Sequence, residues 1–315
     1  MPIGRRSEMP TIAQKNHYNP CFWTAHWNPQ YFEAARRNLK KPAARDQRVL
    51  VLSVKANKVY SQAVRDVHYD KHLGVAEVTM EAADDFCRRY HPGMYEAFKR
   101  DLEPEDYPVV IDFESLFEGS ERLRPYEALL EVIRKNCITS AEEKGQIAHI
   151  IIYQRLRSHA IMNALLESAG KMGREKFEPL IGLKWALSDH RLIYSQIEPL
   201  VLSCWRLFRL VRDTFPLSDS AVSVKPGSVM ATLSPRLLLD VDLRVKELGC
   251  CHQNWIEPEK LSEFRRRTIG DTFREIIFSD QQVLEEWRNE PAFQERVETI
   301  RAMKDYDAVV QADRA

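Results

Sequence analysis

Two histidines near the start of the chain stand in nearly the same local sequence. Residues 17–23 read HYNPCFW and residues 26–32 read HWNPQYF. In each copy Asn-Pro favours an extended asparagine followed by the first turn of a helix, so each histidine is expected just before a helix start. An imidazole titrates near neutral pH, so His17 can serve as a general acid or base. Two other interpretations stay open: a histidine that only hydrogen-bonds its loop, and a metal site formed by His17 and His26.

A buried arginine is predicted on the helix that Ser140 and Glu143 open as a capping box. At about 100° per residue, Arg157 and Gln154 fall in one apolar stripe. The apolar members of this stripe are Ile147, Ile150, Ile151, Ile161 and Leu165. An arginine there needs an anionic partner, because burying it unpaired is too costly. Arg157 therefore either pairs with a structural carboxylate, for which Glu114, Glu118 and Glu121 are candidates, or clamps a bound phosphate or carboxylate.

A third candidate is the pair Ser218-Asp219, which follows Phe215-Pro216 and precedes the strand-like sequence AVSV. A carboxylate at the mouth of a strand can orient a histidine or hold a cation. Aspartate also caps turns by bonding its own backbone. Asp219 is therefore a candidate catalytic residue with a structural alternative.

The elements around these residues define the predicted fold. Helical patterns cover about 29–41, 79–102, 140–168, 176–212 and 258 to the end, and two apolar runs predict a hairpin at about 48–64. Short β-rich runs predict strands at about 215–243. We therefore expect an α+β fold, a predominantly helical single domain with one small antiparallel β-sheet built from the hairpin and the C-terminal strands. Residues 1–15 are expected to form a flexible tail, 16–300 the domain, and 301–315 a helix end and frayed tail.

The composition excludes several classes of protein. Lys+Arg and Asp+Glu both total 46 in 315 residues, so no overall field attracts nucleic acid or an anionic membrane. Six cysteines without CxxC spacing are typical of reduced thiols in a cytosolic protein. The sequence contains neither a secretory signal nor an apolar stretch long enough for a bilayer. We expect a cytoplasmic protein with no membrane partner.

The motifs of the common enzyme and metal sites are missing from the sequence. It contains no Walker loop, GxGxxG, HExxH or GxSxG. His68 and His72 have i,i+4 spacing without an evident third ligand, and Cys250-Cys251-His252 lacks a second ligand pair. We therefore predict no metal-ligating residues.

Several short motifs follow one another in a recognisable order. They are NHYNPCFW, the strand pair VLVLSV and KVYSQAV, FESLFEGSE, IAHIIIYQRLR, and lastly FPLSDSAV, ATLSPRLLL and HQNW. In this order, over residues 16–280, they resemble the family of bacterial proteins with domain of unknown function 4238. The resemblance implies functional positions at His17, Arg157, Ser218 and Asp219, with Glu114 or Glu118 and Asn254, but no established activity. The chain departs from the family at Ala221, where proline usually follows Ser-Asp-x, and this loosens the turn that holds Asp219.

Together these residues favour chemistry at a phosphate or carboxylate centre. Arg157 would bind the anion, His17 would move the proton, and Asp219 would orient the imidazole or hold a cation, for which a divalent ion is the candidate cofactor. The further binding residues expected are Tyr18, Gln154, Ser218, Glu114, Glu118 and Asn254. We therefore predict a phosphodiester-directed hydrolase, such as a nuclease of defence or a toxin, whose partner would be nucleic acid or a small anionic ligand.

Two alternatives belong to other functional classes. The first is a non-enzymatic sensor or interaction protein that binds a small anionic ligand or a protein partner. The second is a buried polar network that only stabilises the fold. Solvent access to His17 and Arg157 separates these alternatives from hydrolysis.

Overall fold

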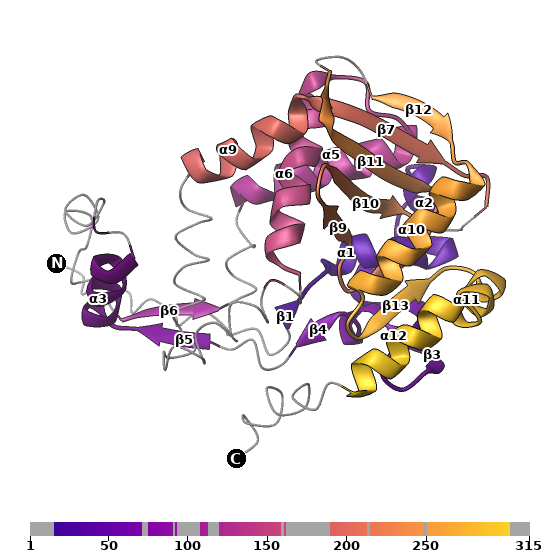
Figure 1. Cartoon of the computed structure of the whole chain (residues 1–315), viewed down its shortest axis with the longest axis horizontal. Coiled ribbons are helices and arrows are strands. Elements are labelled where there is room, and N and C mark those ends of the chain that lie inside the picture. Colours follow the sequence, from indigo (N-terminus) through magenta and orange to yellow (C-terminus); the bar gives the residue numbers. More distant parts are fainter. Residues whose placement is uncertain are drawn as a thin grey trace.

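The computed structural model of the chain describes residues 16–70, 75–90, 92, 108–112, 120–158, 161, 190–212, 215–247 and 251–302. Most strands within these ranges belong to two sheets (Figure 1). The five-stranded sheet contains, in spatial order, β12 (His252–Trp255), β7 (Ser203–Arg209), β11 (Leu237–Lys246), β10 (Ser228–Ser234) and β9 (Val222–Lys225). The four-stranded sheet contains β3 (Lys58–Ala63), β2 (Arg48–Ser53), β13 (Glu275–Phe278) and β8 (Leu217–Ser218).

Two short ladders complete the described strands. They are β1 (Asn16–His17) with β4 (Tyr69–Asp70), and β5 (Val75–Val78) with β6 (Val109–Asp112). Neighbouring strands pair antiparallel throughout the described residues, except that β12 runs parallel to β7.

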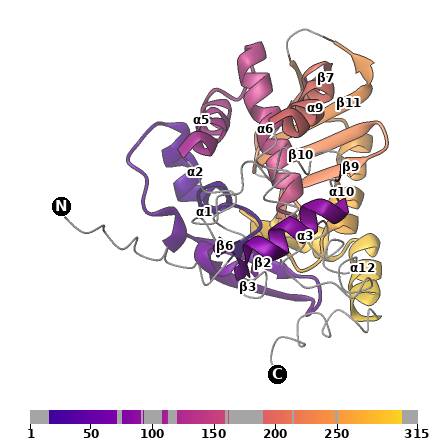
Figure 2. The same ribbon diagram turned by 90° about the vertical axis from the view of Figure 1, so that its left-hand side faces the viewer.

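Helices cover both faces of the five-stranded sheet (Figures 1 and 2). On one face lie α5 (Ser120–Lys135), α6 (Ala141–Leu156) and α9 (His190–Val201). On the other lies α10 (Pro258–Asp271), whereas α11 (Gln281–Arg288) packs on β2 and β13 of the four-stranded sheet and α12 (Pro291–Ala302) packs on α10 and α11. The N-terminal part adds α1 (Cys21–Thr24) and α2 (Pro29–Arg36), and α3 (Met80–Tyr90) lies to one side of this body with β5 and β6. Among the described residues, no helix combines the length and the apolar character needed to cross a bilayer.

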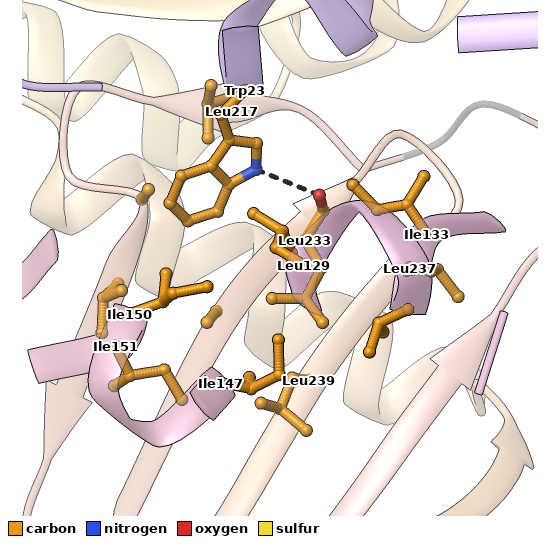
Figure 3. Packing of buried hydrophobic residues seen from close by; sticks show 14 of the residues in the cluster. Trp23, Leu129, Ile133, Ile147, Ile150, Ile151, Leu217, Leu233, Leu237 and Leu239 are labelled. Carbon is orange, nitrogen blue, oxygen red and sulfur yellow. Dashed lines mark hydrogen bonds between the residues drawn. The ribbon is translucent and has the colours of Figure 1, made fainter. Parts of the chain in front are cut away.

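Side-chain alternation along the strands produces two hydrophobic cores. In β7, Trp205 and Leu207 face α5, α6 and α9, whereas Phe208 faces α10. Figure 3 shows the first core, where Ile147, Ile150 and Ile151 of α6 pack against strand residues such as Leu239. The indole N–H of Trp23 enters this core and donates to the carbonyl of Leu233 (3.0 Å). The N-terminal segment is thereby anchored to the sheet.

Two predicted helix starts are confirmed. The side chain of Asn28 accepts from the backbone N–H of Tyr31 (3.0 Å), with Pro29 in the first turn of α2. The hydroxyl of Ser140 accepts from the N–H of Glu143 (3.1 Å) at the start of α6. These contacts span three residues, so local sequence is enough to specify them.

The predicted fold class, predominantly helical with a single small sheet, is wrong. Of the predicted C-terminal strands only β8 shares a sheet with the hairpin, next to β13, whereas β9, β10 and β11 pair with β7 and β12 in a second sheet. Residues 203–209 and 275–278, which the helical patterns predict as helix, are strands. In β7 buried apolar residues lie on both faces, so the segment lacks the strict alternation by which a strand is separated from a helix.

The predicted tail at 1–15 and the residues after 302 lie outside the described residues, as do Glu114 and Glu118.

Candidate functional site

Backbone hydrogen bonds hold the segment that carries His17. His17 pairs with Tyr69 in the β1–β4 ladder, and the N–H of Tyr18 donates to the carbonyl of His68 (2.7 Å). Pro20 has φ −55° and ψ 138°, and α1 begins directly after it. The Asn-Pro sequence therefore turns the chain from a strand into a helix beside residues 68–69.

Asn19 is the centre of a buried polar network. Its amide nitrogen donates to the carbonyl of Ser218 (2.8 Å) and to Nδ1 of His68 (2.7 Å), and its oxygen accepts from the amide of Gln154 (2.6 Å). The same Gln154 amide donates to the carbonyl of Tyr18. Asn19 therefore joins the N-terminal turn, α6 and β8.

The main-chain carbonyls of this network determine how the side-chain amides are oriented and which ring nitrogen of His68 carries the proton. Because the carbonyls of Tyr18 and Ser218 can only accept, the amides of Gln154 and Asn19 must present their nitrogens to them. Nδ1 of His68 then has to accept from Asn19, and its Nε2–H donates to the carbonyl of Glu275 (3.2 Å). His68 is therefore neutral, and burial lowers its pKa to about 3.

Arg157 and His17 do lie together, through the main chain of His17. The guanidinium of Arg157 donates from Nη2 (2.6 Å) and Nε (3.1 Å) to the carbonyl oxygen of His17. The ring Nε2 of His17 donates to the carbonyl of Arg65 (3.2 Å). His17 is 5% exposed and Arg157 is 3% exposed. Both side chains thus bind backbone in the interior, and their burial favours the structural interpretation over an open hydrolytic site.

Asp219 directly follows β8, but its carboxylate hydrogen-bonds groups other than His17 and Arg157. Its carboxylate accepts from the backbone N–H groups of Phe273 (3.1 Å) and Arg274 (2.6 Å). Burial raises the pKa of Asp219 to about 6, although the two N–H bonds oppose this shift. The described contacts of Asp219 therefore hold the entry to β13 rather than the imidazole of His17.

The other predicted binding residues have separate environments. The hydroxyl of Ser218 donates to the carbonyl of Ser220 (2.7 Å) within a local turn, and Asn254 is exposed on the edge strand β12. His26, the second histidine of the opening repeat, is fully buried between aromatic rings, and burial lowers its pKa to about 4. His26 and His17 therefore provide no sign of a two-histidine metal site.

A charged pocket lies elsewhere in the described part of the chain, between α10 and one end of the five-stranded sheet. This pocket has a volume of about 480 Å³. Its lining contains the cationic residues Arg206, Lys225, Arg244, Lys260, Arg266 and Arg267, the acidic residues Asp240, Asp242 and Glu263, and also Pro226 and Ser228. Six cations against three acids leave a local excess of three positive charges in a chain with no net charge.

Hydrogen bonds and ion pairs hold the side chains that line this pocket in place. Arg267, which is 6% exposed, donates to the hydroxyls of Ser223 (3.1 Å) and Ser228 (2.9 Å). The buried carboxylate of Asp240 pairs with Lys260 (2.9 Å) and, more distantly, with Arg206 (3.8 Å). The sequence did not reveal this pocket, because its residues are spread over four strands, among core residues, and meet a helix that begins more than ten residues later.

Among the described residues, one group of Cys, Glu and His side chains brings its possible ligand atoms together: Cys204, Glu247 and His252.

Comparisons of the chain with models of protein families, with curated proteins and with solved structures found no match in any of the three. The resemblance to the domain of unknown function 4238 family therefore stays a prediction.

Proposed function

We propose that the chain binds a small, multiply charged anion, such as a phosphorylated metabolite, in the pocket between α10 and the five-stranded sheet. The proposal rests on the excess of cationic side chains in that pocket. Guanidinium groups bind phosphate through paired hydrogen bonds, and pockets of roughly 300–1,000 Å³ hold small ligands. This is the binding-protein alternative set against hydrolysis above, now at a different place in the fold.

Three of the six cations keep the capacity to bind a ligand. Among the described residues, Arg266 has no carboxylate within 4.0 Å, and Lys225 has only Asp271 at 3.9 Å. Arg206 reaches Asp240 only at 3.8 Å. Arg244, Lys260 and Arg267 are closely paired and shape the site instead. A ligand carrying two or more negative charges would give these weakly paired cations close anionic partners.

Titration calorimetry with ATP as a probe, and with adenosine as its uncharged counterpart, tests this proposal. We expect ATP to bind and adenosine not to bind, with an affinity for ATP that falls as salt screens the charges. Arg266→Glu reverses one weakly paired charge and is expected to weaken ATP binding by at least about tenfold, equivalent to roughly 1.4 kcal/mol.

The matched control is Arg134→Glu, at the exposed end of α5 on the opposite side of the sheet. It makes the same charge change and should leave the affinity for ATP nearly unaltered. Equal weakening by both variants would show only a general charge effect, and failure of ATP and pyrophosphate to bind would refute the proposal.

We keep the phosphodiester hydrolase as a second proposal, because Arg157 and His17 are hydrogen-bonded neighbours. Purified protein would then cleave single- or double-stranded RNA or DNA in the presence of Mg²⁺ or Mn²⁺. His17→Ala is expected to lower cleavage by at least about 100-fold, the usual contribution of a general acid or base, with little change in the melting temperature. Absence of cleavage of every substrate contradicts hydrolysis. A large fall in melting temperature for His17→Ala would favour the structural network.

We also propose a cytoplasmic location, which the free thiols of Cys137 and Cys204 support. Thiol labelling in freshly lysed cells should find these cysteines reduced, and a disulfide at any of them would contradict this location.

A further inference from the structure

Segments on both sides of β7 bring Glu247 and His252 to Cys204 near the start of that strand. In the sheet β7 lies between β11 and β12 (Figure 1). The register of β11 is irregular between Asp242 and Lys246, after which the N–H of Glu247 donates to the carbonyl of Leu202 (2.8 Å). His252 then begins β12 on the opposite side of β7. Glu247 and His252 thus approach Cys204 from the two neighbouring strands.

The donor atoms of these three side chains meet. Sγ of Cys204, a carboxylate oxygen of Glu247 and a ring nitrogen of His252 all lie within 4.8 Å of one another. Nε2 of His252 and Oε1 of Glu247 are 2.7 Å apart. The arrangement gathers one sulfur, one oxygen and one nitrogen donor.

This donor set has the chemistry of a zinc site. Thiolate, imidazole and carboxylate bind Zn²⁺ at roughly 2.0–2.3 Å, so the ligand atoms of a tetrahedral site lie roughly 3.3–3.8 Å apart. Mg²⁺ and Ca²⁺ prefer oxygen ligands alone, which a cysteine and a histidine do not supply. The side chain of His252 is 52% exposed and that of Glu247 is 33% exposed, so both can adjust by the ångström or so that coordination requires. Cys204, buried near the start of β7, supplies the fixed ligand.

We propose that Cys204, Glu247 and His252 form a Zn²⁺ site that leaves one coordination position open on the solvent side. Three protein ligands with an open position are typical of zinc that polarises a bound water or ligand.

Two cations, Lys144 and Arg206, lie near the proposed site. Nζ of Lys144 donates to the carbonyls of Ser203 (2.9 Å) and Glu247 (3.2 Å) and lies over the ring of Trp205. These hydrogen bonds of Lys144 go to backbone oxygens, and its charge also acts on the Glu247 carboxylate. Arg206 follows Cys204 by two residues on the same face of β7 and lines the anion pocket. The proposed metal would lie next to that pocket, but its binding does not depend on the pocket having a ligand.

Cobalt substitution tests the site directly, because Co²⁺ adopts the geometry of Zn²⁺ and reports thiolate ligation by a charge-transfer band. The full chain, reduced and freed of metal, is titrated with Co²⁺ and then with Zn²⁺ in competition with a coloured chelator. We expect one Co²⁺ per chain, a thiolate charge-transfer band, and displacement of cobalt by zinc. Cys204→Ser should abolish the band and weaken Zn²⁺ binding by at least about 100-fold, since loss of even an outer-shell partner costs 10–100-fold.

Two further ligand variants and two controls make the assignment specific. Glu247→Gln and His252→Gln should each weaken Zn²⁺ binding by at least about tenfold while the thiolate band persists at saturating cobalt. Cys137→Ser and Glu257→Gln change the same residue types outside the cluster and should bind as the unaltered chain does. A band that survives Cys204→Ser but is lost in Cys250→Ser or Cys251→Ser would overturn the assignment, as would a chain that binds neither metal.

Discussion

Replacement of Asn19 by alanine is expected to lower the free energy of unfolding by about 3–5 kcal/mol, because each buried polar group left without its partner costs roughly 1–3 kcal/mol. The variant removes the bonds to His68, Ser218 and Gln154 at once. These partners are buried, so water cannot simply take the place of the lost amide. Urea unfolding monitored by tryptophan fluorescence measures the change.

Asn254→Ala is the matched control, since Asn254 is exposed on β12. It is expected to change the free energy of unfolding by less than about 0.5 kcal/mol, as is usual for surface substitutions. A loss below about 1 kcal/mol for Asn19→Ala would mean that the network contributes little to stability. The side chains around His17 would then be available for a role other than holding the fold.

The stability of the protein should also fall as the pH is lowered from 6 to 4.5. His68 and His26 have folded-state pKa values of about 3 and about 4, below the ordinary value of 6.5. In this window both are neutral in the folded protein and protonated in the unfolded chain, so acid favours unfolding. Asp219 has the opposite effect, because its folded-state pKa of about 6 lies above the ordinary 3.8 and the folded protein holds its proton. Two protons bound on unfolding and one released leave a net slope of about 1.4 kcal/mol per pH unit.

Two substitutions should change this slope in opposite directions. Asp219→Asn removes the opposing group, and the slope is expected to double to about 2.8 kcal/mol per pH unit. His26→Phe removes one histidine and leaves the remaining His68 balanced by Asp219, so the slope should fall close to zero. Urea unfolding at several pH values gives each slope independently of how much the substitution itself destabilises the protein. Identical slopes for all three proteins would show that these buried groups titrate normally.

The local parts of the fold could be predicted because their causes lie within a few residues. The caps at Asn28 and Ser140 and the hairpin that became β2 and β3 depend on neighbouring side chains and a short turn. The division of the strands into two sheets could not be predicted in this way. Ile276 of β13 pairs with Leu52 of β2 and with Ser218 of β8, across separations of more than fifty residues. Such pairing is decided by which faces of distant segments pack, and EIIF reads equally as a helix or a strand.

For the candidate sites, the sequence by itself determined that polar residues such as His17, Gln154 and Arg157 stand on otherwise apolar elements and must find buried partners. Only the tertiary structure decided which partners they find. Arg157 binds the carbonyl of His17, and Asn19 binds that of Ser218. Every residue carries a main-chain carbonyl, so residue types hold no trace of such contacts. The same holds for Cys204, Glu247 and His252, which become neighbours only because β7 lies between β11 and β12.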